Sequence, residues 1–228
     1  MKNIYKIALG LLLMGGLSSC ELFEAPNDTE NVQELLITFP EIILTGDPYV
    51  TVTVGESFTD PGATAALGTQ DVSDQVEVVT DLDLNTPGIY TATYSISTTN
   101  ELGTESTVVT SRYFSVVDPG ALASISSTDL SGNYIGTGFS ANPSVATVTK
   151  VGEGWYTINR ILSSGNNIGA VFAHVGGNDL VIPDQPGPFG NINTTAAGTN
   201  ATITPGGFNW TVFIGCCGNF GPIDFVKQ

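Results

Sequence analysis

The chain has 228 residues, enough for two domains of roughly 100 residues each. Lys and Arg number 6 against 22 Asp and Glu, a formal charge of −16, and a protein this acidic repels phosphate backbones, which excludes nucleic acids as partners. Only 12% of the residues are charged, 41% are hydrophobic, and 27 Gly and 12 Pro accompany abundant Thr and Val, a composition typical of strands and turns.

The first segment has the order of a secretory signal peptide: Lys2 and Lys6, an apolar run over 7–17, then small residues up to Cys20. As a helix, about 11 apolar residues span ~16 Å, too short for a hydrocarbon core of about 30 Å. We therefore expect residues 1–19 to be removed, which leaves a mature chain with a charge of −18.

Leu17-Ser18-Ser19-Cys20 resembles the lipobox of bacterial lipoproteins. The resemblance implies cleavage before Cys20 and acylation of its sulfur and amine, and several acyl chains on one residue anchor a protein stably. An ordinary signal peptide followed by a free cysteine is the alternative. The acidic, base-free stretch over 20–35 predicts a solvated tether. It also resembles the surface-export signal of Bacteroidetes lipoproteins, which implies an outer-membrane location facing outward, with the periplasmic face as the alternative.

Residues 36–118 show alternating apolar and polar residues broken by Gly, Pro, Asn and Asp, a pattern that predicts short strands. The spacing of these strands favours a β-sandwich. Strands are expected over 35–44, 49–54, 75–80, 88–97 and 104–117.

Two segments of this region resemble a bacterial Ig-like domain that is also named for a pesticidal crystal toxin. Residues 54–65 (VGESFTDPGATA) follow the pattern G-x-x-(aromatic)-x-D-P-G-x-x-A. Residues 85–94 (NTPGIYTATY) match T-x-P-G-x-Y-x-x-x-Y except at its first position, where Asn85 stands. The resemblance covers roughly residues 37–117. It implies an Ig-like sandwich of the kind found in Bacteroidetes surface lipoproteins.

A calcium site in this domain is not expected. The Asp-rich turn of the family is weak here, because 66–74 holds only two acids. Asp81, Asp83 and Asn85 have the spacing of a calcium loop, but Thr86 and Ala92 stand where such a loop needs Gly and Glu. We expect these acids to lie on a solvated strand face.

The chain changes character near residue 118. Residues 21–118 hold 17 of the 22 acids, whereas 18 of the 27 glycines fall after residue 118. The small and polar stretch over 119–130 predicts a linker, followed by a second domain over 131–228. Strands separated by Gly-containing hairpin turns are expected at 144–151, 155–162, 168–175, 180–183, 201–204 and 208–214.

About eight sequential strands predict an antiparallel meander, closed as a small barrel or flattened as a sandwich. Residues 130–134 (LSGNY) and 148–158 (VTKVGEGWYTI) resemble uncharacterised Bacteroidetes lipoproteins in which an all-β domain follows an Ig-like domain. Those proteins resemble accessory lipoproteins of glycan-uptake systems. The resemblance therefore implies a glycan-related role.

Catalysis is not expected, and no cofactor or metal is either. The sole histidine, His174, alternates with Phe172 and should lie in the core or at its rim. No Gly-x-Ser-x-Gly elbow is present. A glycosidase needs two carboxylates on either side of the bond. The acids of the second domain are expected in turns, in the linker or near the terminus: Asp129, Glu153, Asp179, Asp184 and Asp224.

Aromatic residues offer the best candidate contacts to a ligand. Trp210 alternates with apolar residues and should be core, whereas Trp155 shares a strand face with Thr157 and Asn159. A tryptophan on a polar face is unusual, and its ring could stack on a sugar. A tryptophan covered by a loop is the alternative. The candidate glycan contacts are Trp155, Asn159 and two residues of the 184–189 loop, Asp184 and Phe189.

Cys216 and Cys217 are adjacent, and an exported protein meets an oxidising compartment. They form either a vicinal disulfide, which would give a rigid apolar patch at a loop tip, or two free thiols in a hairpin. Adjacent thiolates chelate a tetrahedral ion poorly. The sequence thus predicts a non-enzymatic, lipid-anchored, glycan-binding protein. A structural or adhesion protein with a protein partner in a surface complex is the alternative.

Overall fold

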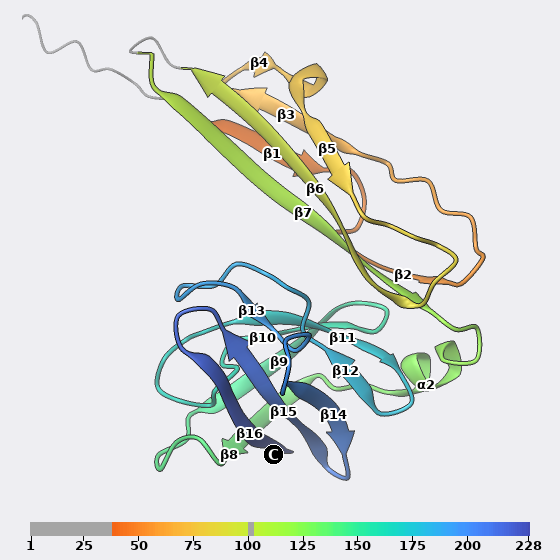
Figure 1. Cartoon of the computed structure of the whole chain (residues 1–228), viewed down its shortest axis with the longest axis vertical. Helices are drawn as coiled ribbons and strands as arrows, with labels where there is room; N and C mark the ends of the chain where they lie inside the picture. Colours follow the sequence, from red (N-terminus) through yellow and green to blue (C-terminus); the bar gives the residue numbers. More distant parts are fainter. Residues whose placement is uncertain (1–37, 100–102) are drawn as a thin grey trace, which may run out of the picture. The chain divides into compact units, whose positions relative to one another are not determined.

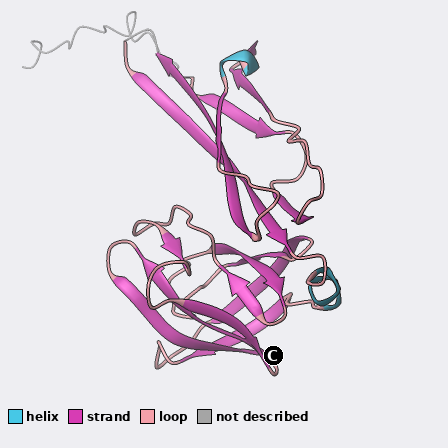
Figure 2. Ribbon diagram, turned by 45° about the vertical axis from the view of Figure 1, so that its right-hand side comes forward, coloured by secondary structure: helices cyan, strands magenta, loops and turns pink. Residues whose placement is uncertain are grey.

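Strands make up most of the ordered elements in the computed structural model, which describes residues 38–99 and 103–228. The signal peptide, Cys20 and the tether over 20–35 lie outside these residues. The described part contains one short α-helix, α2 (Leu122–Ser127), and one 3-10 turn, η1 (Ser73–Gln75) (Figure 2). The expected all-β class is confirmed. None of the helices described is long and apolar enough to cross a membrane.

Two sheets built from residues 40–117 form the expected Ig-like sandwich. One sheet has the order β1 (Pro40–Leu44), β3 (Ala63–Leu67), β4 (Gln70–Asp71). The other has the order β2 (Tyr49–Thr53), β7 (Glu105–Val117), β6 (Gly88–Thr99), β5 (Glu77–Thr80), with β2 parallel to β7. Alternation along β6 buries Ala92, Tyr94 and Ile96 between the sheets. The apolar positions of the repeat therefore form the core, as the pattern predicts.

Three features of this region differ from the expectation. Strands β3 and β4 were not predicted, because β3 consists mainly of alanine, a poor strand former, and β4 has two residues. The acids at 81–85 lie in a loop, so the expected strand face is wrong. There the Asp81 carboxylate accepts a hydrogen bond from the Thr91 amide at 2.6 Å, and Asp83 accepts one from the Asn85 amide at 2.9 Å. These carboxylates cap local backbone groups.

A third sheet closes on itself as an eight-stranded barrel (Figure 1). Strand β16 pairs with β15 on one side and with β8 on the other, which completes the ring. The barrel strands are β8 (Gly132–Thr137), β9 (Val145–Gly152), β10 (Trp155–Ile158), β11 (Ala170–Gly176), β12 (Asp179–Val181), β14 (Asn200–Thr204), β15 (Gly207–Ile214) and β16 (Gly218–Lys227). The two-residue strand β13 (Ile192–Asn193) pairs with β15. Of the two expected forms of the meander, the barrel is correct.

Aromatic rings fill the barrel. Phe208 lies at the centre of the cluster, with ring centroids 4.8 Å from Tyr134, 4.9 Å from Trp210 and 4.9 Å from Phe225. All four side chains are fully buried. The interior of an eight-stranded barrel is narrow, and large side chains fill it completely. A ligand of this domain must therefore bind to the loops or the outer surface.

The stretch over 119–130, expected to be an irregular linker, contains α2. Ile125 of this helix is fully buried, and the Ser124 hydroxyl accepts a hydrogen bond from the Gly177 amide at 3.0 Å. Single buried residues in a six-residue helix leave no periodic signal in the sequence, so the helix was not predicted.

Residues 38–228 form one compact unit.

Alkaline pH is expected to destabilise the barrel through Tyr134. Its hydroxyl donates to the Leu130 carbonyl at 2.7 Å, and burial raises its pKa to about 12. Above pH ~10 the unfolded tyrosine ionises while the folded one stays protonated, so the free energy of unfolding falls between pH ~10 and ~12. The expected loss is on the order of 2–3 kcal/mol. Urea titrations at pH 9 and pH 12 measure it.

The control for this prediction is Tyr134→Phe, which removes the titrating group and keeps the ring. The loss of unfolding free energy between pH 9 and pH 12 should be smaller in Tyr134→Phe than in the parent protein, by about 2–3 kcal/mol. An identical loss in both proteins would contradict the assignment to Tyr134.

Candidate functional site

The topology brings four loops to one end of the barrel. Because consecutive barrel strands are antiparallel, every second connection lies at the same end. The connections at this end, here called the loop end, are 138–144, 159–169, 182–199 and 215–217. Among the sequence-predicted candidates, Asn159, Asp184, Phe189 and the two cysteines belong to the loop end. Trp155 starts β10 and lies at the opposite end.

Gln185 fixes the loop that contains Asp184 and Phe189. Its side-chain oxygen accepts from the Val171 amide at 2.9 Å, and its side-chain nitrogen donates to the Val171 carbonyl at 2.7 Å. Its backbone makes two further hydrogen bonds with Ile192, of 3.1 Å and 2.8 Å. The loop is thereby attached to β11 in the way a paired strand would be. The sequence analysis did not identify Gln185, because no local pattern distinguishes a buried glutamine from an exposed one in a loop.

Two asparagine amides orient the Asp184 carboxylate. Asn191 donates to one oxygen at 2.7 Å and Asn193 donates to the other at 2.8 Å. Asp184 and Asn191 are exposed, whereas Asn193 is buried on β13. A carboxylate held by two amides presents its remaining lone pairs in a fixed direction. The sequence indicated Asp184 but not the two asparagines.

The turn between β15 and β16 carries a disulfide between Cys216 and Cys217. This turn lies directly against the 184–190 loop: the Cys216 amide donates to the Phe189 carbonyl at 2.9 Å, and the Gly215 amide donates to the Asn191 carbonyl at 2.8 Å. Gly190 has φ +94°, and a Cβ there would lie 3.2 Å from the Cα of Gly215. The close approach of the two loops thus requires glycine.

The two hydrogen-bonded loops expose an aromatic ring, a disulfide and a carboxylate. Phe189 is 51% exposed, and both cysteines are exposed. We call Asp184, Phe189, Cys216 and Cys217 the Phe189–disulfide tip. The structure therefore brings together two loops that the sequence analysis had proposed separately.

Trp155 is not part of this surface. It is fully buried, and its ring centroid lies 5.6 Å from that of Tyr49 and 6.3 Å from that of Tyr113. Its indole N–H donates to the Val50 carbonyl at 3.2 Å. Of the two readings, the exposed, sugar-stacking tryptophan is wrong. Trp155 is covered, as the alternative expects, but by aromatic side chains of β2 and β7 rather than by a loop.

Asn159 serves the backbone rather than a surface. Its side-chain oxygen accepts from the Thr147 amide at 2.8 Å, and this bond extends the β9–β10 pairing by one residue. Asn159 is exposed at the loop end.

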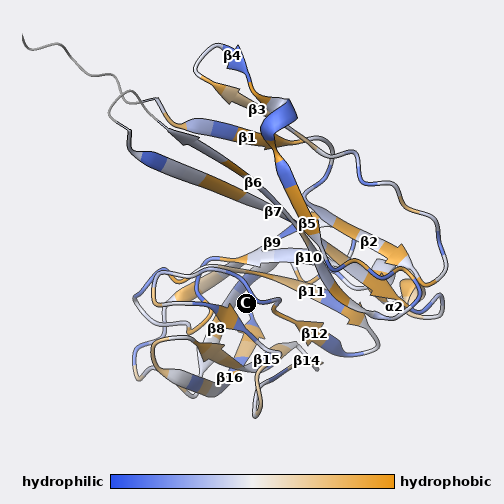
Figure 3. Cartoon of the chain, turned by 45° about the horizontal axis from the view of Figure 1, so that its top comes forward, coloured by the Kyte–Doolittle hydropathy of each residue, from blue (hydrophilic) through white to orange (hydrophobic). Residues whose placement is uncertain are grey.

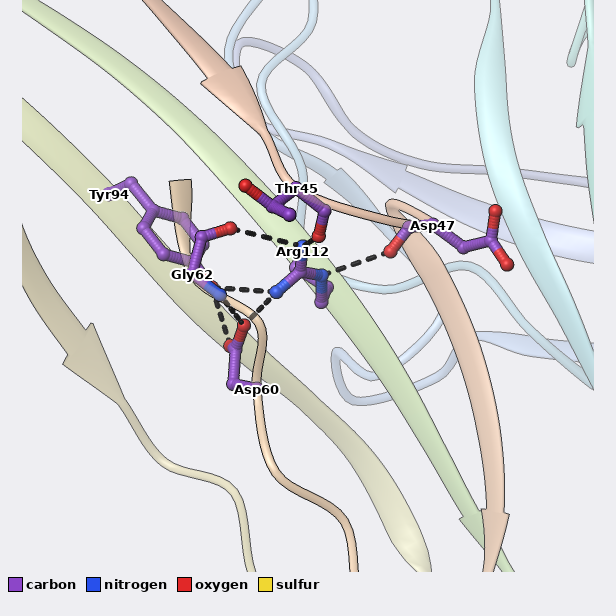
Figure 4. Close-up of polar contacts among 6 residues, drawn as sticks. All are labelled: Thr45, Asp47, Asp60, Gly62, Tyr94 and Arg112. Atoms are coloured by element: carbon purple, nitrogen blue, oxygen red, sulfur yellow. Dashed lines mark hydrogen bonds and ion pairs between the residues drawn. The ribbon is translucent and has the colours of Figure 1, made fainter. Parts of the chain in front are cut away.

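A buried cation holds the Ig-like sandwich together (Figure 4). Arg112 is fully buried, forms an ion pair with Asp60, and donates to the Tyr94 hydroxyl at 2.9 Å. It also donates to the carbonyls of Thr45 at 2.5 Å, Asp47 at 2.9 Å and Gly62 at 3.3 Å. Burial lowers the pKa of Arg112 and raises that of Tyr94. Because the guanidinium is saturated and inaccessible, this cluster is structural.

The same cluster explains the two motifs of the sandwich. Asp60 and Gly62 come from the D-P-G segment, and Tyr94 is the last residue of the T-x-P-G-x-Y-x-x-x-Y segment. The Tyr94 hydroxyl donates to the second Asp60 oxygen at 2.5 Å, and the first Asp60 oxygen accepts from the Gly62 amide at 2.8 Å. The motif residues are therefore those that pack around Arg112.

His174 lies in the barrel wall. His174 is fully buried, as its alternation with Phe172 predicts, and burial lowers its pKa. Its Nε2 lies 3.0 Å from the Gly177 carbonyl. Within residues 38–99 and 103–228, no three or more His, Cys, Asp or Glu side chains are grouped so as to hold a metal ion.

Comparison with known proteins identifies the first domain. Residues 42–113 match the model of the family described as "Bacterial surface protein, Ig-like domain". No curated protein matches the chain.

Solved structures resemble the chain only distantly. A lipoprotein from Bacteroides thetaiotaomicron is 23% identical, with 83% of this chain and 100% of that chain covered and a TM-score of 0.34. A CBM51 module in complex with GlcNAc, from Clostridium perfringens ZmpB, is 21% identical, with 62% and 30% covered and a TM-score of 0.30. The M60 catalytic domain of ZmpB with its CBM51 modules is also 21% identical, with 63% and 15% covered and a TM-score of 0.31. TM-scores this low assign no ligand to the chain.

Proposed function

We propose that this protein is a non-enzymatic, lipid-anchored protein of the bacterial cell surface that binds a glycan through the Phe189–disulfide tip. The observation that carries the proposal is the tip itself. It exposes an aromatic ring, a disulfide and an oriented carboxylate on two loops that are hydrogen-bonded to each other.

The chemistry of the tip fits a sugar ring. A pyranose has a C–H face that packs on flat apolar groups, and a rim of hydroxyl groups that donate to carboxylates. Ligand sites generally combine mostly apolar contact with a few placed polar groups. Phe189 and the disulfide supply the apolar contact, and Asp184 supplies the polar group. Because the backbone bonds described above already order both loops, little conformational entropy is lost when a ligand binds.

The charge of the protein favours a neutral glycan. Without residues 1–19 the chain carries −18, and the tip itself contains a carboxylate. Uronate-containing or sulfated polysaccharides would be repelled by this field. The expected ligand is therefore an uncharged polysaccharide.

Further observations support an anchored cell-surface location and a non-enzymatic role. The lipobox-like segment ending at Cys20 supports an anchor, and the match of residues 42–113 to a bacterial surface domain supports the cell surface. Both oxygens of Asp184 accept from asparagine amides, and an acid that donates a proton to a glycosidic bond needs a free, protonated oxygen.

Affinity gel electrophoresis of residues 21–228, the mature chain without the lipid-anchored Cys20, tests the proposed ligand class. Native gels containing neutral polysaccharides are compared with gels containing acidic ones at equal concentration. We expect retardation by at least one neutral polysaccharide and none by the acidic set. Unretarded migration in every gel, or retardation by the acidic set alone, would contradict the proposal.

A further inference from the structure

We infer that the free edge of β5 is a docking strand for an extended, basic segment of a partner protein. This surface lies in the Ig-like sandwich and uses none of the residues of the Phe189–disulfide tip. Its role is therefore independent of glycan binding.

The register shows which backbone groups of β5 are unpaired. Within residues 38–99 and 103–228, β5 is the last strand of its sheet and pairs with β6 alone. The Asp81 amide bonds to the Thr91 carbonyl at 3.3 Å and continues that register. In an antiparallel ladder the bonded residues alternate, so Glu77 and Val79 bond to β6 while Val78 and Thr80 point their N–H and C=O groups away from it. β5 thus presents a row of donors and acceptors to a further strand.

The edge also exposes two valine side chains. All four residues of β5 are exposed, with Val78 at 52% and Val79 at 72%. In Figure 3, β5 is coloured hydrophobic after its hydrophilic first residue. β5 has no lysine, proline or bulge, three of the features with which proteins block a free edge. A free edge of this kind accepts an added strand by main-chain hydrogen bonding.

The acidic residues around β5 favour a basic partner strand. Asp74, Glu77 and Asp81 are exposed on and beside β5. Arg112, the one Lys or Arg residue within 21–118, is buried in its ion pair with Asp60. A second copy of the chain would bring the same carboxylates against each other, which disfavours self-association through this edge. A partner strand with alternating basic and apolar residues would instead pair its cations with these acids.

Amide exchange on the mature protein tests this inference directly. The probe is a short synthetic peptide that alternates lysine and valine, and the readout is NMR hydrogen exchange. We expect saturating peptide to slow exchange of the Val78 and Thr80 amides roughly tenfold or more, because these N–H groups become bonded. The Glu77 and Val79 amides, already bonded to β6, should change little.

Two controls separate strand addition from simple charge attraction. A peptide of the same charge interrupted by prolines cannot extend the sheet and should not slow exchange at Val78 or Thr80. The variant Val78→Pro removes one outward N–H and none of the β5–β6 bonds, and should weaken peptide binding roughly tenfold. Val109→Thr, at an exposed position on a different strand, β7, should bind normally.

Unchanged exchange at Val78 and Thr80 with the alternating peptide would overturn the inference. Equal slowing by the proline-interrupted peptide would overturn it as well. Neither result would bear on glycan binding, since the polysaccharide gels report on different residues.

Discussion

Replacing Arg112 with methionine is expected to lower the free energy of unfolding by about 3–5 kcal/mol, the cost of breaking a buried ion pair by removing one partner. The substitution keeps most of the side-chain volume but leaves the Asp60 carboxylate and the Tyr94 hydroxyl without their cation. It also strips a donor from the carbonyls of Thr45 and Asp47. Urea unfolding of the mature protein, followed by circular dichroism, measures the loss.

Lys150→Met is the matched control for this change. Lys150 pairs with Glu153 at 3.1 Å, but the two side chains are 37% and 45% exposed. Exposed ion pairs contribute about 0–1 kcal/mol, so this variant should be almost as stable as the parent protein. If Arg112→Met were no more destabilising than Lys150→Met, the structural role assigned to the buried cluster would be wrong.

Phe208→Ala is expected to cost about 3–5 kcal/mol, the range for removing a large aromatic residue from a core. Phe208 is fully buried and contacts four other rings: Tyr134, Phe172, Trp210 and Phe225. Its removal leaves a cavity at the centre of a closed barrel, whose hydrogen-bonded wall cannot collapse to fill it. The same urea titration reports the change.

The control here is Phe189→Ala, which removes the same side chain from a position that is 51% exposed. Surface substitutions usually change stability by less than about 0.5 kcal/mol. Equal stability of the two variants would show that the barrel interior is not the core described here.

Local patterns in the sequence were sufficient for the class of fold. Alternation along 88–97 and 208–214 predicts strands β6 and β15 because each buries every second residue in a core. It fails for β3, whose alanines have little strand preference, and for α2, which is too short for a period. Barrel closure was left open because it depends on β16 reaching β8, a pairing between residues far apart in the chain.

The candidate site was predictable only in part. Asp184, Phe189 and the two cysteines stand out as loop residues of unusual type, and the structure joins them through backbone bonds that no local pattern encodes. Trp155 shows the limit of such reasoning. Alternation placed it on a polar strand face with Thr157 and Asn159, but the sequence holds no signal that Tyr49 and Tyr113 would cover it.

The most direct test of the proposed site is affinity gel electrophoresis with a neutral polysaccharide, comparing the mature protein with Phe189→Ala and Phe39→Ala. Phe39 is also an exposed phenylalanine, at 61%, but belongs to the Ig-like region. The account predicts that Phe189→Ala weakens retardation roughly tenfold, about 1.4 kcal/mol, while Phe39→Ala migrates like the parent protein. Full retardation of Phe189→Ala would contradict binding at the Phe189–disulfide tip.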